Sequence, residues 1–464
     1  MGRTANGIGV DQQRSASGDS AGAAPGQRTA RRLYVSVTGK FAVAQALALS
    51  WLGMSVWLSL PWVGELASAI TVLPAILVVS LIAYLPGWLV AFLAISLVLD
   101  RQPPLRSSHP TIPVTVLIAA RNEAERIQET IARIARQDYL GPVQVLVVDN
   151  GSTDGTRSIA EAFGAANDLD VRCITEPRPG KSHALNTGLA AVATELVITL
   201  DADTLLHQRA IRQLVGRLLS APEDVQAVAG SVLVRNSRDN LWTRMQEWDY
   251  FLGIASVKRM QGLYQGTLVA QGAFSLYRAQ AVLAAGGWPD AIGEDIVLTW
   301  QLMRHGARVY YEPSAVAFTA APTRLIHLAR QRARWARGMI EGIRSVKPWA
   351  QPRWLLRFLT AIDLLIPALD VAYALVWLPG LALAATGRYW IVGPYTLAVL
   401  PLTLVVNAIL YRYQRRQVFN VLGLRVRRNS LGFIAFVLTY QMLMSPIAVV
   451  GYGQELLGLR RRWK

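Results

Sequence analysis

Two carboxylates that stand one residue apart, Asp201 and Asp203, directly follow the apolar run Leu196–Leu200. Such a pair can hold a divalent ion against diphosphate oxygens. Mg²⁺ and Mn²⁺ suit this task because they prefer oxygen ligands and share them with substrate phosphates. An isolated Asp-x-Asp also occurs on solvated surface turns. Its place at the end of an apolar run favours the metal-binding interpretation.

A third carboxylate, Asp149, ends the apolar run Val143–Asp149 and precedes a tight Asn-Gly-Ser turn. It can accept hydrogen bonds from a base or a ribose, although a turn that caps the next helix would use the same residue types. Lys181 could contact a phosphate or lie on the surface. Its Gly-Lys-Ser run is not a P-loop, because Thr175 stands where that motif requires its first glycine.

The run Gly293-Glu294-Asp295 opens a helix-like stretch and supplies a candidate general base. A base must lie on a rigid element within reach of the hydroxyl that it deprotonates, and Asp295 is our candidate. Acidic residues in the first turn of a helix also complement its dipole, which is an alternative without a catalytic role.

The fourth group, Gln331, Arg334 and Trp335, lies in the basic helix-like stretch Leu325–Ile343. Arg334 can stabilise a diphosphate, and Trp335 can offer its ring face to a sugar. The alternative is an amphipathic helix that rests on a bilayer. Both interpretations can hold together.

The elements that must position these residues alternate between short apolar strands and helix-like stretches. Apolar strands that alternate with helices predict an α/β fold with a mostly parallel sheet covered on both faces. In such sheets ligands bind beyond the carboxyl ends of the strands, where Asp149 and Asp201 stand. The predicted strands are Val114–Ala120, Val143–Asp149, Val171–Thr175 and Leu196–Asp201, and the predicted helices include Glu123–Arg136 and Ser182–Val192.

Long apolar segments flank this region and predict a membrane protein. No charge interrupts Phe41–Val63 or Ala67–Leu99, and each exceeds the roughly 20 residues that cross a bilayer as a helix. A short turn around Glu65 should join them. Further spans are predicted near Phe358–Leu383, Trp390–Tyr411 and Leu431–Val450.

The net charge of +17 comes largely from arginines beside the apolar segments, which the positive-inside bias explains better than nucleic-acid binding. This bias predicts a multi-pass protein of the bacterial inner (cytoplasmic) membrane, with its N-terminus and catalytic domain in the cytosol. Five spans would place the basic C-terminal residues outside, so the topology of the last 40 or so residues is left open, with a re-entrant segment at Pro446 as one alternative.

Together these observations predict five regions of the chain. They are a disordered basic tail (1–34), two transmembrane helices (35–100), a cytosolic α/β domain (101–322), an amphipathic interface helix (323–350) and a C-terminal transmembrane region of about three spans (351–464).

Residues 110–345 resemble processive, inverting membrane glycosyltransferases of the cellulose, hyaluronan and chitin synthase type. Bacterial poly-N-acetylglucosamine synthases and rhizobial chitooligosaccharide synthases look nearest. The resemblance implies a GT-A-type nucleotide-sugar-binding fold flanked by transmembrane helices. It rests on ordered motifs, namely Ala-Arg-Asn122-Glu123, the Asp149 turn, Gly180-Lys181-Ser182, Asp201-Ala-Asp203, Gly293-Glu-Asp295 and Gln331-x-x-Arg334-Trp335.

The resemblance also implies a role for each motif. Asp149 would bind the uridine, Asp201 and Asp203 would hold the diphosphate through Mg²⁺ or Mn²⁺, and Asp295 would be the catalytic base. The donor would contact Asn122, Glu123, Asp149, Lys181 and Asp201, and the acceptor and diphosphate would contact Glu294, Gln331, Arg334 and Trp335. Gln271 stands where relatives often carry Ser or Cys, and Asn150 replaces the commoner second Asp of its turn.

The leading hypothesis is therefore a UDP-sugar-dependent inverting hexosyltransferase that extends a β-linked polysaccharide, with N-acetylglucosamine as the expected sugar, and feeds it into the membrane. Its partners would be the UDP-sugar, the growing polysaccharide or a lipid acceptor, and the bilayer, but no nucleic acid. The alternative is a non-processive transferase that adds one or a few sugars to a lipid. The sequence leaves open whether accessory export subunits complete the path.

Overall fold

All strands of the described chain belong to one sheet. The computed structural model describes residues 35–107, 109–425 and 427–459, without the side chains of 394–402. The strands are β1 (Val114–Ala120), β2 (Val143–Asp149), β3 (Val171–Thr175), β4 (Leu196–Leu200), β5 (Leu205–Leu206), β6 (Val225–Val234), β7 (Phe274–Arg278) and β8 (Arg308–Thr319).

The strand order is β3-β2-β1-β4-β7-β6-β8-β5. The first four strands in this order run parallel to one another, as do β6 and β8. Strand β7 runs antiparallel to both of its neighbours, and β5 runs antiparallel to β8. The predicted mostly parallel α/β sheet is confirmed, and the four predicted strands form one continuous parallel part of it.

Alternation along the strands divides the core into two layers. On β1, Val116 and Ile118 pack into one hydrophobic cluster while Leu117 packs into the other, because successive side chains point to opposite faces. Burial on both faces is why these strands read as continuous apolar runs rather than as alternating ones.

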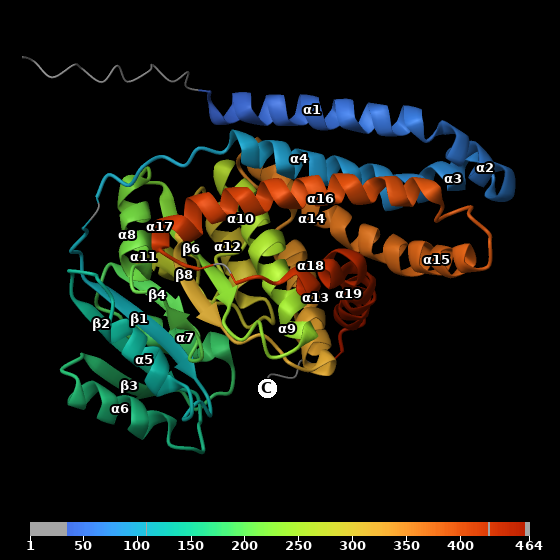
Figure 1. Cartoon of the computed structure of the whole chain (residues 1–464). Coiled ribbons are helices and arrows are strands. Elements are labelled where there is room, and N and C mark those ends of the chain that lie inside the picture. The colour runs from blue at the N-terminus through green and yellow to red at the C-terminus, as the bar shows by residue number, and fades with distance from the viewer. Residues whose placement is uncertain (1–34, 108, 426, 460–464) are drawn as a thin grey trace, which may run out of the picture. The chain divides into compact units, whose positions relative to one another are not determined.

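Helices cover both faces of the sheet (Figure 1). Helices α5, α6 and α8 cover one face, and α7, α10 and α12 cover the other. Their bounds are α5 (Ile127–Ala135), α6 (Thr156–Ala166), α7 (Lys181–Ala191), α8 (Ala210–Ser220), α9 (Leu241–Trp248), α10 (Ala255–Leu263), α11 (Ala279–Ala284), α12 (Glu294–Arg304) and α13 (Leu325–Ser345). Helix α5 begins four residues later than the predicted Glu123, which lies instead in the preceding turn.

Four helical segments in the described part of the chain are long and apolar enough to cross a membrane. They are Val37–Leu58, Val72–Leu99, Trp354–Ala385 and Ser430–Leu456. Their helices are α1 (Val37–Leu58), α3 (Val72–Val79), α4 (Leu85–Leu99), α14 (Trp354–Ala372), α15 (Leu378–Ala385), α18 (Ser430–Ala435) and α19 (Gln441–Leu456), joined where needed by short π-helical turns.

The connections between the apolar segments differ from the sequence-based expectation. Glu65 lies in a separate helix, α2 (Leu60–Ile70), rather than in a short turn, and the second span begins after Thr71, whose φ is +73°. Helix α19 continues through Pro446 without a break. The fourth predicted span, Trp390–Tyr411, overlaps α16 (Pro394–Gln414) and stays a prediction, because residues 394–402 lack described side chains.

Some predicted features lie outside the described residues. They are the disordered tail 1–34 and the basic C-terminal residues 460–464.

A buried junction fixes the end of α4 to the sheet domain. The Asp100 carboxylate, one residue beyond α4, lies 2.6 Å from the Arg259 guanidinium on α10, and both side chains are buried. The Tyr413 hydroxyl on α16 donates to the same carboxylate at 2.9 Å. One turn earlier on α4, Ser96 shares a 2.8 Å hydrogen bond with the Tyr264 hydroxyl. The membrane-spanning part and the sheet domain are therefore packed as one core.

Candidate active site

The residues predicted to bind the donor gather at one edge of the sheet. Asn122 and Glu123 follow β1, Asp149 ends β2 and Asp201 follows β4, and these three parallel strands are neighbours in the sheet. Their carboxyl ends therefore meet at one edge, where open α/β sheets bind ligands.

The turns after β1 and β2 are tied to each other. Asn122, with a φ of +56°, accepts hydrogen bonds through Oδ1 from the Thr153 backbone N–H at 2.8 Å and donates its own N–H to Ser152 Oγ at 3.0 Å. The Asp149 carboxylate accepts the Ser152 N–H at 3.2 Å. Asn122 thus shapes the turn that presents Asp149. To make these contacts its backbone adopts the left-handed conformation, which Asn tolerates better than most residues.

Asn150 has a structural role that the sequence did not indicate. Its amide nitrogen donates to the carbonyls of Glu176 (2.9 Å) and Arg178 (2.7 Å), while its oxygen accepts the Gly180 N–H at 2.8 Å. An aspartate could not donate the first two hydrogen bonds. Asn150 therefore holds the loop that leads directly to Lys181.

Lys181 joins two of the predicted motifs. Its Nζ lies 2.6 Å from Asp201 Oδ1 and 3.6 Å from Glu294 Oε1. Burial alone would lower the pKa of Lys181, but the two carboxylates outweigh it and raise that pKa above its usual value. Gly272 leaves room for the ammonium group, since a Cβ there would lie 2.8 Å from Nζ. Lys181 is thus a fixed cation between the end of β4 and the start of α12.

Asp201 and Asp203 form a pair that suits a divalent cation. Burial, followed by the charge of Asp201, raises the pKa of Asp203, so the two carboxylates are held together against their repulsion. Among the described residues no group of three or more His, Cys, Asp or Glu side chains could hold a metal ion. The residues fit an ion that takes its remaining ligands from donor phosphates and water, as Mg²⁺ commonly does.

Glu123 completes the acidic group beside this pair. Burial raises its pKa, with Asp203 as the next cause, while Arg126 lowers it through a contact at 3.5 Å.

The two acidic residues at the start of α12 face different partners. Asp295 accepts the Gly272 N–H at 3.1 Å through Oδ2 and the Ile296 N–H at 2.9 Å through Oδ1. Glu294 instead lies beside Lys181, and burial raises its pKa to about 7 although Lys181 lowers it. Asp295 is thereby turned toward the segment that contains Gly272, while Glu294 supports the lysine on the donor side.

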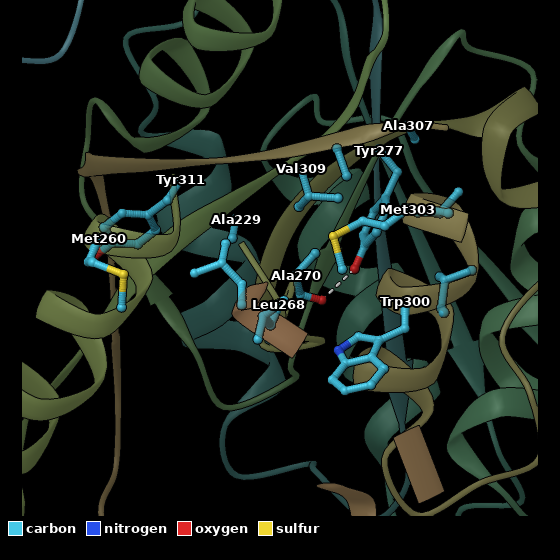
Figure 2. Packing of buried hydrophobic residues seen from close by; sticks show 14 of the residues in the cluster. Ala229, Met260, Leu268, Ala270, Tyr277, Trp300, Met303, Ala307, Val309 and Tyr311 are labelled. Carbon is cyan, nitrogen blue, oxygen red and sulfur yellow. Dashed lines mark hydrogen bonds between the residues drawn. The ribbon is translucent and has the colours of Figure 1, made fainter. Parts of the chain in front are cut away.

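The segment Ala270–Ala273 beside Asp295 is anchored in the core. Figure 2 shows Ala270 among buried side chains, with the Tyr277 hydroxyl donating to its carbonyl at 2.6 Å. The next residue, Gln271, accepts a hydrogen bond from the Lys258 ammonium and donates to the Gly230 carbonyl at 2.9 Å. Burial lowers the pKa of Lys258 to about 7, opposed by the charge of Asp295. Lys258 belongs to no motif, and sequence reasoning missed it.

Helix α13 carries the fourth motif, whose residues have unequal surroundings. The Arg332 guanidinium lies 4.1 Å from the centre of the Trp335 ring and pairs with Asp249 at 2.6 Å, so one face of the tryptophan is covered. Gln331 Oε1 is buried without a hydrogen-bond partner among the described residues, and Arg334 is exposed.

Tyr250 lies beside Trp335 of the fourth motif. Its ring centre is 6.2 Å from that of Trp335. Burial raises the pKa of Tyr250 to about 12, opposed first by the charge of Arg332, while Asp249 and, more weakly, Asp203 raise the pKa and Arg334 lowers it. This tyrosine, which sequence reasoning also missed, is therefore near the fourth motif and within reach of the charge of Asp203.

Helix α13 packs directly against the turn that precedes Asp295. The Gly338 and Gly293 backbones approach so closely that a Cβ on Gly293 would lie 2.6 Å from the Gly338 Cα. The Glu341 carboxylate accepts the Gly293 N–H at 2.9 Å. On its other side, α13 pairs Arg337 with Glu455 of α19 at 3.0 Å. The inner face of the helix thus packs against protein and fixes the start of α12.

Comparison with known proteins identifies the region that holds these motifs. Residues 110–338 match the model described as glycosyltransferase-like family 2. These residues form a family 2 glycosyltransferase domain. The matched region includes all four groups described above, namely Asp149, the Asp201–Asp203 pair, Gly293–Asp295 and Gln331–Trp335.

Similar proteins support this assignment. Poly-beta-1,6-N-acetyl-D-glucosamine synthase of Staphylococcus aureus is 32% identical over 226 residues, which are 48% of this chain and 54% of that protein. The enzyme of the same name from Staphylococcus epidermidis is 30% identical over 241 residues, 52% of this chain and 58% of its own. The expected resemblance to bacterial poly-N-acetylglucosamine synthases is confirmed, and the chain spans about half the length of these relatives.

A solved structure agrees on the fold. Mannosyltransferase PcManGT from Pyrobaculum calidifontis, in complex with GDP-Man and Mn²⁺, superposes with a TM-score of 0.54 at 21% identity and covers 92% of this chain and 100% of its own. The glycosyltransferase domain has the predicted GT-A-like α/β fold, and four apolar helical segments accompany it in the described part of the chain, at four of the five predicted positions.

Proposed function

We propose that this protein transfers N-acetylglucosamine from UDP-N-acetylglucosamine to the end of a growing β-linked polysaccharide and passes the product into the membrane. The observation that carries this proposal is the junction at Lys181. It joins the Asp201 carboxylate at the end of β4 to Glu294, next to the candidate base Asp295. The names of the staphylococcal relatives support the choice of sugar.

On the donor side, the uridine would lie against Asp149, in the turn that Asn122 holds in place. Asp201 and Asp203 would hold Mg²⁺ or Mn²⁺, which supplies positive charge to the leaving diphosphate when bound. Lys181 adds a second, fixed cation beside Asp201. Such preorganised charges stabilise a transition state in which the diphosphate becomes more negative.

On the acceptor side, the Asp295 carboxylate would take the proton of the attacking hydroxyl. The hydroxyl oxygen forms a bond to the anomeric carbon as the bond from that carbon to the diphosphate breaks, so UDP leaves from the opposite face and the configuration inverts. The Gly272 N–H holds the carboxylate in place for this step. Arg334 would contact the diphosphate, and the Trp335 ring would contact the acceptor.

The membrane setting supports a polymer as the product. Four apolar helical segments accompany the domain, and the buried pair of Asp100 and Arg259 fixes α4 to it. We place the protein in the bacterial inner membrane with its catalytic domain in the cytosol, where nucleotide-sugars are made, in agreement with the arginine-rich connections.

The test uses the full chain in lipid nanodiscs with radiolabelled UDP-N-acetylglucosamine and Mg²⁺ or Mn²⁺. We expect a labelled polymer, no labelled product after EDTA treatment, and a loss of at least about 10³-fold for Asp295→Asn, within the range for removal of a general base. The matched control is Asp168→Asn, an exposed aspartate whose φ of +51° asparagine also accepts. Full activity of Asp295→Asn would refute the assigned base, and a lipid-linked single sugar would refute polymerisation.

A further inference from the structure

A basic hollow lies where α16 leaves the apolar region. Two adjoining cavities of about 360 and 410 Å³ share the residues Tyr411, Arg415 and Asn420. Arg412 and Arg416 line the first cavity and Arg425 lines the second, so four arginines in all line this hollow of two adjoining cavities. Cavities of this size are within the range that accepts small ligands.

These arginines have no anionic partner within the described residues. None of the described ion pairs includes them. Other arginines of the described chain are paired with a carboxylate, namely Arg212, Arg217, Arg259, Arg332 and Arg337. The Asp100 carboxylate, which accepts a hydrogen bond from Tyr413 of α16, is already paired with Arg259. Four uncompensated guanidinium groups around one hollow favour a bound anion, and the planar guanidinium matches the oxygens of a phosphate.

The position of the hollow indicates where the phosphate comes from. The Tyr413 hydroxyl, in the last turns of α16, contacts Asp100 directly after the apolar segment Val72–Leu99. The chain enters the next apolar segment at Ser430, five residues after Arg425. The hollow therefore lies at the level where apolar helices end, which in a membrane is the level of the lipid phosphates.

We infer that this hollow binds the phosphate of an anionic membrane phospholipid, held by Arg412, Arg415, Arg416 and Arg425. The Tyr411 ring, packed against Phe251 at 6.0 Å between ring centres, forms an immobile wall beside the acyl chains. Asn429, which accepts the Gly432 N–H at 3.2 Å, caps the helix that follows and fixes the far end of the loop. The site is separate from the acidic edge of the sheet and does not depend on the reaction proposed above.

The experiment counts bound lipids on the delipidated full chain by native mass spectrometry, during titration with phosphatidylglycerol or phosphatidylcholine. We expect the wild type to retain phosphatidylglycerol selectively. The variant Arg415→Gln/Arg416→Gln should bind it about 25-fold more weakly, which is about 2 kcal/mol at 1.4 kcal/mol per tenfold for two arginines. Equal retention by variant and wild type would overturn the inference.

Two further variants and one further ligand make the result specific. The control Arg172→Gln/Arg304→Gln removes the same charge from exposed positions of the sheet domain and should retain the lipid. Arg415→Lys/Arg416→Lys should fold as the wild type does and bind with intermediate affinity, since it keeps the charge but not the planar fork. Radiolabelled inorganic phosphate should neither bind detectably nor displace the lipid at about 10 mM, a concentration about ten thousand times a micromolar Kd for the lipid. Displacement by phosphate would overturn the lipid assignment.

Discussion

Replacement of Gly338 by alanine should separate the position of the candidate base from the stability of the fold. The new Cβ would lie 2.8 Å from the Gly293 Cα and 3.2 Å from its nitrogen. Carbon atoms in contact are normally about 3.5–4.0 Å apart, so the start of α12 must shift by about 0.7 Å or more. Asp295 lies two residues after Gly293 and must shift with it.

The effect on activity should be larger than the effect on stability. A displacement near 1 Å at a reacting group can cost about 10²-fold in rate, so we expect kcat to fall about 30- to 100-fold. Overpacking should cost about 1–3 kcal/mol of unfolding free energy, of which the better helix propensity of alanine restores about 1 kcal/mol. The net loss of about 0–2 kcal/mol leaves the protein folded.

The assay compares sugar transfer with thermal unfolding for Gly338→Ala and for a matched control. Gly453→Ala makes the same change within helix α19, at a position where a Cβ meets nothing within 4 Å. The control should keep wild-type activity and gain a little stability. If Gly338→Ala turned over like the wild type, α13 would not determine the position of Asp295, and the reasoning from the Gly293 contact would be refuted.

Three other changes have defined outcomes. Lys181→Met should lower kcat/KM about 10- to 150-fold, because it removes charged hydrogen bonds worth about 1.5–3 kcal/mol, and steady-state kinetics beside the milder Lys181→Arg would check this. Lys258 has a pKa of about 7 in the folded protein and about 10.4 in the unfolded chain. Between pH 7 and about 10.4 the unfolded chain therefore binds one more proton than the folded protein. The free energy of unfolding should rise with pH in this range, by up to about 1.4 kcal/mol per pH unit. Lys258→Met should lack this rise in its apparent Tm, and an unchanged pH dependence would contradict the assigned burial. Asp370→Ala should lower the apparent Tm, because the Asp370 carboxylate on α14 accepts hydrogen bonds from Ser445 at 2.6 Å and Tyr452 at 2.8 Å, both on α19. An unchanged Tm would show that these bonds contribute nothing to stability.

The sequence was sufficient to predict features that depend on a single strand or a single helix. Strand β2 could be read from its apolar residues Val145 to Val148 because both of its faces are buried. Its terminal Asp149 and the Asp201 after β4 then had to share an edge, since parallel strands end on the same side. The span predicted near Phe358–Leu383 was likewise evident from length and apolarity alone, and it lies within the apolar helical segment Trp354–Ala385.

Features that depend on contacts between distant segments could not be predicted. Nothing local to Asn150 shows that it holds a loop near residue 178, and nothing local to Lys258 shows that it bonds to Gln271. The contact of Gly293 with Gly338 joins two helices that a short-range pattern treats independently. The break at Thr71 was missed for another reason, because apolar composition continues through it and hides the change in backbone direction.

Two neighbouring residues of α10 connect the apolar helix α4 to the segment Ala270–Ala273 beside Asp295. Arg259 is held by Asp100 at the end of α4, while Lys258, one residue earlier, is held by Gln271 beside Asp295. A change in the tilt of α4, such as a thinner or thicker bilayer imposes, must therefore either separate a buried ion pair or move α10. Bilayer thickness thereby becomes a variable to which the rate of sugar transfer should respond.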